Sequence, residues 1–119
     1  MLIHGQSHGG IAQGIGQALS EHCVYDFGSG QLLSASLMDY AVPRAGDLPL
    51  FKTEISEVPS TTNPLGMRGG SEGGITPGLA AVTNAIVDAL AEFGVEHIEM
   101  PATPERVWRA IQTASRRVL

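Results

Sequence analysis

The sequence contains a single cysteine, Cys23, and aromatic residues make up only 5% of its 119 residues. One cysteine excludes an intrachain disulfide bond and indicates a reducing compartment such as the cytoplasm. It also excludes an iron–sulfur cluster held by this chain alone, because such a cluster needs about four cysteines. The place of Cys23 just before a predicted strand favours a buried structural thiol over a reactive one.

Long hydrophobic runs and a basic patch are also missing. The apolar runs fall far short of the ~20 residues that span a bilayer, and the N-terminal stretch lacks the pattern of a signal peptide. The formal net charge is −5, so neither a membrane nor a nucleic acid is expected as a partner. Four arginines near the C-terminus alternate with apolar residues, as on the solvated face of a helix: Arg106, Arg109, Arg116 and Arg117.

The sequence does contain enough apolar residues for a core. Hydrophobic residues form 43% of the chain, which predicts a folded protein. A length of 119 residues fits one domain and not two. Because no internal repeat and no linker divides the chain, we expect a single domain over residues 1–119.

Three segments have the apolar periodicity of helices. The first covers residues 8–22, with Ser7 as its predicted N-cap. The second is predicted to begin at the N-cap Thr76 and to end at Gly94. The third follows the predicted cap Thr103.

Glycines are unusually frequent in the first helix, at Gly10, Gly14 and Gly16. Each interior glycine costs about 0.5–1 kcal/mol relative to alanine. Close packing of another helix or a sheet against the backbone explains such a cost. The alternative is an anionic ligand at the helix start, where Gly9 and free N–H groups suit it; an independent anion- or nucleotide-binding module would follow.

The remaining patterned segments predict strands. A hairpin is expected over residues 23–38, and single strands over 50–58 and 95–100. The resulting order, α-β-β-β-α-β-α, predicts an α+β fold with helices packed on a mixed β-sheet. The strand–helix–strand order predicts a right-handed crossover.

Residues 59–75 form a long stretch without periodicity, and such loops are usually functional or disordered. Its glycine-rich part, "GMRGGSEGG", holds one acid, Glu72, shortly before the predicted second helix. A helix N-terminus favours negative charge there. Glu72 is therefore either incidental to a flexible loop or a general base that the loop aims at a ligand.

Other chemistry finds little support in the sequence. His4 and His8 are four positions apart, but no further ligand stands nearby, so no zinc site is expected. Neither a serine nucleophile elbow nor a complete phosphate-binding loop is present.

Four stretches taken together, "GQSHGGIAQGIGQALSE", "MDYAVPRAGDLPLF", "TNPLGMRGGSEGG" and "ATPERVWRAI", resemble the C-terminal part of a molybdopterin-binding large subunit. The family is that of xanthine dehydrogenase, aldehyde oxidase and aerobic carbon monoxide dehydrogenase. Its large subunit is several times longer than this chain. The resemblance therefore implies part of an oxidoreductase that adds water-derived oxygen to a small substrate, and an isolated chain that is inactive.

Residue by residue, the resemblance implies that Glu72 is the base that takes a proton from a metal-bound hydroxyl group. It implies that Gln6 contacts the pterin, and that no residue of this chain ligates the metal. Ser71 belongs to the same cofactor-binding turn, although it stands where the family usually has glycine. The remaining cofactor-binding positions are the loop glycines Gly69, Gly70 and Gly73.

The implied cofactor is molybdenum–molybdopterin, with the cytosine dinucleotide form as one alternative, shared with segments absent from this chain. The implied partners are the remaining large-subunit segments, iron–sulfur and flavin subunits or domains, and a small-molecule substrate. The alternative interpretation is a non-catalytic truncated relic or interaction domain of the same fold, which forms a homo-oligomer through its apolar surfaces.

Overall fold

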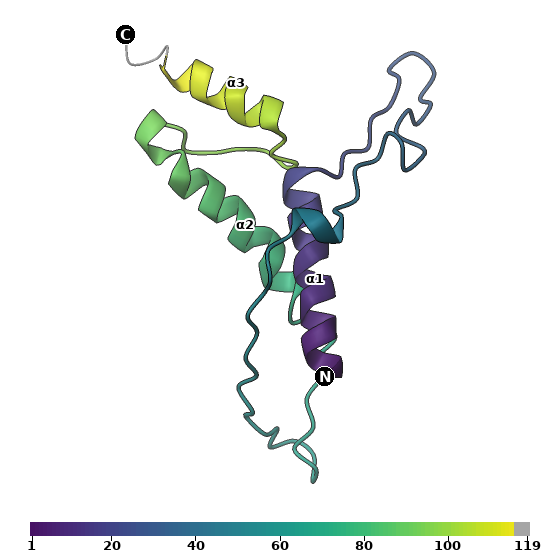
Figure 1. Cartoon of the computed structure of the whole chain (residues 1–119), viewed down its shortest axis with the longest axis vertical. Helices are drawn as coiled ribbons and strands as arrows, with labels where there is room; N and C mark the ends of the chain where they lie inside the picture. The colour runs from purple at the N-terminus through teal and green to yellow at the C-terminus, as the bar shows by residue number, and fades with distance from the viewer. Residues whose placement is uncertain (116–119) are drawn as a thin grey trace.

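The structure is a computed structural model that describes residues 1–115. Figure 1 shows helices α1 and α2 packed against each other, with α3 beside the C-terminal end of α2. Long irregular segments connect these helices. In chain order the elements are α1 (Leu2–Leu19), the 3-10 helix η1 (Ala45–Asp47), α2 (Ile75–Ala89), the 3-10 helix η2 (Ala91–Phe93) and α3 (Pro104–Ser115).

The molecule is extended rather than compact. Its radius of gyration is 18.5 Å and its principal extents are 60 × 39 × 29 Å, whereas a compact domain of this length has a radius of gyration of about 13–14 Å. Figure 1 shows two excursions from the helices: an arm between α1 and η1, and a longer loop between η1 and α2. Much of the chain therefore lies far from any core.

The predicted α+β fold with a mixed β-sheet is wrong. Within residues 1–115, the β-pairing consists of one isolated antiparallel bridge between Tyr25 and Leu32. Residues 50–58 and 95–100 are extended and have no partner strand in the described part of the chain. A strand needs neighbours for its N–H and C=O groups, and about three strands for independent stability. The predicted strands, their order and the crossover are therefore wrong.

The predicted hairpin at 23–38 is present only as a chain reversal. The Asp26 N–H donates to the Gln31 carbonyl at 2.8 Å. The carboxylate of Asp26 also accepts bonds from the Ser29 hydroxyl (2.6 Å) and N–H (2.8 Å), and these bonds lower the pKa of Asp26. Cys23 lies on this arm and is exposed, so the prediction of a buried thiol is wrong.

The three predicted helices are confirmed, but two of their N-caps are wrong. Helix α1 begins well before Ser7, and α2 begins before Thr76, with no side-chain cap at either start. Thr103 is confirmed, since its hydroxyl accepts the N–H of Arg106 at 3.4 Å. Gly94 ends η2 with a left-handed φ of 75°, which glycine adopts without strain.

The glycines of α1 allow its backbone to touch that of α2. A Cβ atom at Gly10 would lie 2.7 Å from the Ile75 nitrogen, and one at Gly14 would lie 2.8 Å from the Leu79 nitrogen. Real Cβ atoms essentially never come so close to backbone. Packing against another helix is therefore the confirmed role of these two glycines.

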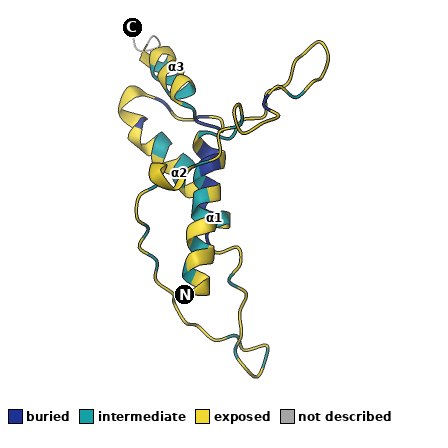
Figure 2. Ribbon diagram, turned by 45° about the vertical axis from the view of Figure 1, so that its right-hand side comes forward, coloured by how far each residue is buried: buried dark blue, intermediate teal, exposed yellow. Residues whose placement is uncertain are grey.

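The core is small and lies between the C-terminal half of α2, α3 and the extended segment that joins them (Figure 2). Its buried members are Leu90, Val95, Ile98 and Ala102. Large apolar side chains elsewhere lie mostly in solvent, including Phe27, Leu37, Met38, Leu50 and Leu65. Apolar surface on this scale is typical of a face that another chain segment covers.

Helix α3 carries a polar face with an ion pair between Arg109 and Glu105 at 2.7 Å. Both side chains are 69% exposed, so the pair contributes at most about 0.5 kcal/mol to helix stability. Arg116 and Arg117 lie outside the described residues. Among residues 1–115, no helix combines the length and apolar character that crossing a bilayer requires.

Candidate functional site

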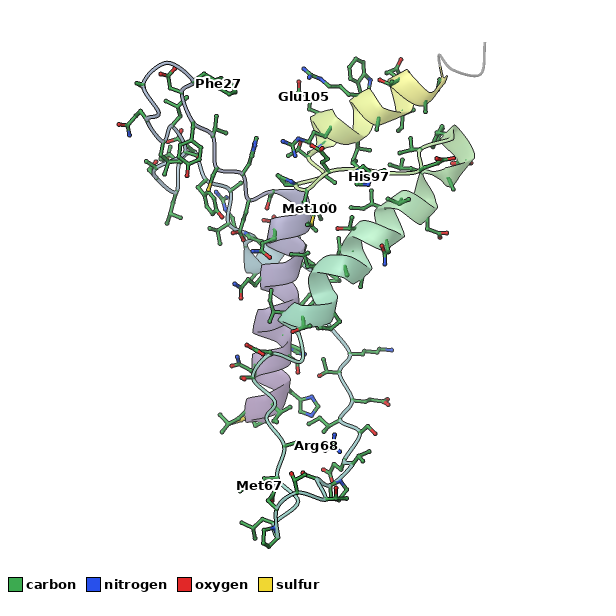
Figure 3. The ribbon with its side chains drawn as sticks, turned by 180° about the vertical axis from the view of Figure 1, so that it is seen from behind. Phe27, Met67, Arg68, His97, Met100 and Glu105 are labelled. Atoms are coloured by element: carbon green, nitrogen blue, oxygen red, sulfur yellow. The ribbon has the colours of Figure 1, made fainter. Side chains whose placement is uncertain are left out.

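The loop that carries Glu72 lies at the end of the molecule where α1 begins, and Figure 3 labels Met67 and Arg68 there. Glu72 is exposed. Its backbone carbonyl accepts the N–H of Thr76 at 3.2 Å, so Glu72 directly precedes the first turn of α2. The first turn of α2 has few free donors, because the Thr76 and Gly78 N–H groups are bonded to the Glu72 and Gly74 carbonyls at 3.2 Å and Pro77 has no N–H.

Gln6 of α1 contacts this loop. Its Nε2 atom donates a hydrogen bond to the Ser71 carbonyl at 3.0 Å, across 65 positions of sequence. Because Glu72 follows Ser71, three of the predicted site residues lie in one place. The Gln6 amide keeps one N–H donor and its oxygen acceptor for another partner.

The loop glycines divide into two kinds. A Cβ at Gly70 would lie 2.6 Å from the Ile3 Cδ1 atom, so this glycine lets the loop pack on α1. Around Gly69 and Gly73 no atom lies within 4 Å of such a Cβ. These two positions are open, and another molecule could approach the backbone there. Ser71 can replace the glycine that is usual at this position without backbone strain, because no non-glycine residue among those described has a positive φ.

His4 and His8 both lie on α1, because the helix begins at Leu2 and not at residue 8 as predicted. The Thr53 hydroxyl is 2.7 Å from His4 Nδ1 and 3.4 Å from His8 Nε2. The His8 ring also meets the Phe51 ring edge-on, at 5.7 Å between centroids. The two histidines therefore hold the extended segment 50–58 against α1. Within the described residues, no three His, Cys, Asp or Glu side chains are grouped to hold a metal ion.

Asn63 is a residue whose contact the sequence interpretation missed. Its Oδ1 accepts the Met67 N–H at 2.9 Å, and its Nδ2 donates to the Met67 carbonyl at 3.0 Å. The signal was present as Asn63-Pro64-Leu65-Gly66, since a type I turn favours asparagine first, proline second and glycine fourth. The contact with Met67, four positions after Asn63, does not follow from that pattern.

A second polar contact lies beyond the other end of α1. The Tyr40 hydroxyl donates to Glu21 Oε2 at 2.7 Å. This bond, with smaller effects from desolvation and the negative charge of Glu21, raises the pKa of Tyr40 to about 12. The contact fastens the segment after the arm to the end of α1.

The Tyr40–Glu21 contact predicts a pH dependence. Because the folded pKa of Tyr40 lies above the unfolded value of about 10, its contribution to stability is complete below pH ~10 and is lost as pH rises through 12. We expect tyrosinate absorbance in a Tyr25→Phe background, where Tyr40 is the remaining tyrosine, to show a midpoint near 12. Glu21→Gln should move that midpoint toward 10; an unmoved midpoint would contradict the assignment.

Comparison with known proteins identifies similar sequences over most of the chain. Residues 1–49 match the model of a molybdopterin cofactor-binding domain. The carbon monoxide dehydrogenase large chain of Hydrogenophaga pseudoflava is 38% identical over 112 residues, which are 94% of this chain and 14% of that protein. The nicotine 6-hydroxylase large subunit of Paenarthrobacter nicotinovorans is 42% identical over 109 residues, which are 92% of this chain and 13% of that protein.

Solved structures show the same similarity. The crystal structure of quinoline 2-oxidoreductase from Pseudomonas putida 86 superposes with a TM-score of 0.85 and 44% sequence identity. The match covers 94% of this chain and 14% of that one. The chain thus spans about one-seventh of the relatives it matches, and the extended segments of this fold occur within a much larger protein.

Proposed function

We propose that this chain, which belongs to the molybdenum hydroxylase family of xanthine dehydrogenase, aldehyde oxidoreductase and carbon monoxide dehydrogenase, supplies a base and part of the cofactor cradle of an oxidoreductase. The chain is the counterpart of one segment of the molybdenum-binding large subunit. The observation that carries the proposal is the hydrogen bond from Gln6 to Ser71. It joins the residue matched to a pterin contact with the loop that holds the residue matched to the catalytic base.

The geometry of the loop fits a molybdopterin cofactor. Gly69 and Gly73 leave open backbone that a ligand can approach, and Gln6 keeps one donor and one acceptor. The exposed Ser71 adds a hydroxyl beside them. When bound, the cofactor supplies the two-electron redox chemistry that these side chains lack. In this proposal Gln6 and Ser71 hold it by hydrogen bonds and Gly69 and Gly73 by close backbone approach. Gly70, which was predicted to bind the cofactor directly, packs on Ile3 and keeps the loop against α1.

Glu72 acts as the general base in this proposal. Within residues 1–115 its carboxylate accepts no hydrogen bond and forms no ion pair, so both oxygens are available to take a proton. A carboxylate on a loop of fixed shape has the geometry that general-base catalysis requires.

The remaining large-subunit segments are the proposed partners that cover the exposed apolar side chains. Related proteins carry subunit designations, and we extend the proposal to iron–sulfur and flavin subunits, which carry the electrons away. A non-catalytic relic that self-associates would expose the same surfaces. Metal content separates the two hypotheses, because a relic has no use for the cofactor.

The test is co-expression of the chain with its neighbouring coding sequences, followed by molybdenum analysis and turnover assays of the complex. Carbon monoxide, nicotine and quinoline are the first probes, since the names of three relatives contain them. We expect about one molybdenum per chain and oxidation of a probe of this chemical range. A complex without molybdenum would overturn the proposal. The nucleotide released from the cofactor tells whether it is the cytosine dinucleotide form.

Gly73→Ala provides a matched prediction for the cradle. Since Gly73 has open space around it and no positive φ, we expect an unchanged melting temperature but several-fold less molybdenum in the purified complex. Gly46→Ala is the control, because Gly46 on η1 is equally open and far from the loop. A Gly73→Ala complex with normal molybdenum content would show that the cofactor does not approach there.

A further inference from the structure

The loop before Glu72 starts from a tight turn. The Gly66 N–H donates to the Asn63 carbonyl at 3.1 Å, and the Ser60 N–H donates to the Gly66 carbonyl at 3.0 Å. Gly66 has a left-handed φ of 64°, and a Cβ there would lie 2.9 Å from the Pro59 Cβ. This turn therefore has one backbone shape, which glycine alone allows without strain.

The Asn63 side chain extends this turn by one residue. Its amide bonds both the N–H and the C=O of Met67, at 2.9 and 3.0 Å, as a neighbouring strand would. Asparagine is suited to this contact because its amide carries an acceptor and a donor side by side. Met67 is thereby fixed although its side chain is 65% exposed.

The same loop is held at its other end by α1. Gln6 donates to the Ser71 carbonyl at 3.0 Å, and the Ile3 side chain packs where Gly70 has no Cβ. Only Arg68, Gly69 and Gly70 lie between the residue fixed by Asn63 and the residue fixed by Gln6. A segment this short has little freedom once both ends are held.

We propose that Asn63 is a positioning residue for Glu72: its amide fixes Met67, Gln6 fixes Ser71, and together they set the direction of the next side chain, Glu72. The inference rests on the proposed function, because positioning matters only if Glu72 is the base. Asn63 itself touches neither substrate nor cofactor in this scheme. Its effect is on the geometry of the base, which determines the rate of proton transfer.

The test uses two variants in the assembled complex. Asn63→Asp keeps the volume and the acceptor but removes the donor to the Met67 carbonyl, and Asn63→Ala removes both bonds. Asn84→Asp on the exposed face of α2 makes the same chemical change elsewhere and is the control. The readouts are hydrogen exchange of peptides covering residues 63–74, the melting temperature, and kcat and KM on whichever probe the wild-type complex oxidises.

For Asn63→Ala we expect roughly three- to tenfold faster exchange in residues 67–73, the effect of losing a hydrogen bond. We expect kcat to fall by as much as about a hundredfold while KM and molybdenum content stay unchanged. Asn63→Asp should fall between this variant and the wild type, and Asn84→Asp should match the wild type in every readout.

Unchanged exchange, or faster exchange with unchanged kcat, would overturn the positioning role. A lower melting temperature with normal kcat would identify a purely structural residue and would equally overturn it. If the wild-type complex oxidises no probe, exchange alone decides whether Asn63 holds the loop. If Glu72→Gln retains full turnover, the proposed function fails, and that result is distinct from every outcome for Asn63.

Discussion

Glu72→Gln is expected to lower kcat of the assembled enzyme by about a hundredfold or more, the contribution of a positioned general base. Glutamine keeps the size and shape of glutamate but cannot accept the proton. Molybdenum content and melting temperature should stay unchanged, because the Glu72 carboxylate makes no hydrogen bond or ion pair within residues 1–115. A similar KM is also expected, since the substitution removes an interaction of the transition state.

Glu57→Gln is the matched control for this experiment. Glu57 is an exposed glutamate on the extended segment that precedes the loop, so its replacement makes the same change in charge without touching the site. The complex with Glu57→Gln should turn over at the wild-type rate. Full activity of the Glu72→Gln complex would show that another group is the base.

The second large effect is expected for Gly14→Ala, which should destabilise the docking of α1 and α2. The added Cβ would meet backbone atoms of Leu79 and Gly78 at 2.8 and 2.9 Å, and backbone cannot rotate aside as a side chain can. Overpacking of this kind costs about 1–3 kcal/mol, more than the ~0.5–1 kcal/mol that alanine gains over glycine in a helix. Urea unfolding of the complex measures the difference.

Two glycine positions serve as controls for the docking surface. A Cβ at Gly78 would lie 3.6 Å from its nearest neighbour, which is ordinary van der Waals contact, and one at Gly5 would meet nothing within 4 Å. Gly5→Ala should therefore stabilise α1 by up to about 1 kcal/mol, and Gly78→Ala should do little harm. Equal losses in Gly14→Ala and Gly78→Ala would show that the helix contact is looser than described.

The sequence predicted the helices well because helical signals are local. Apolar periodicity placed all three helices, and Thr103 was identified at the start of α3. The second helix was predicted to end at Gly94, but α2 ends at Ala89 and Gly94 ends the 3-10 helix η2 that follows it. Gly10 and Gly14 were also interpreted correctly, since interior glycines are unfavourable in a helix unless something packs closely against them. The starts of α1 and α2 were wrong because the prediction relied on side-chain caps, and neither helix has one at its start.

The sheet could not be predicted in this way. Alternating apolar residues show that a segment is extended, but they do not show which strand lies beside it, and pairing is decided by residues far away or in other segments. Residues 50–58 illustrate this, since they lie along α1 through Thr53 and its two histidine partners instead of in a sheet. Cys23 was predicted to be buried because a strand was expected to follow it, and without a sheet its thiol is exposed.

The candidate site was predicted in part. The glycine-rich loop and its single acid stood out by composition, and Gln6 was singled out by the resemblance to a family. The hydrogen bond that joins Gln6 to the loop was not predicted. Asn63 was passed over because its turn pattern is common and its partner, Met67, has no polar side chain to suggest a contact. A hydrogen bond between a side chain and the backbone does not depend on the side chain of the residue contacted, so the residue type at Met67 does not reveal it.

The hydrogen bond from Gln6 to Ser71 bears on the order in which contacts form in a newly synthesised chain. Contacts between positions 65 residues apart form late, because the intervening chain must close first. A ribosome-bound chain that ends before Ser71 already contains all of α1, yet it has no loop for Gln6 to hold. In the proposed scheme, the part of the cofactor cradle that joins Gln6 to the loop is therefore complete only after the loop has been synthesised.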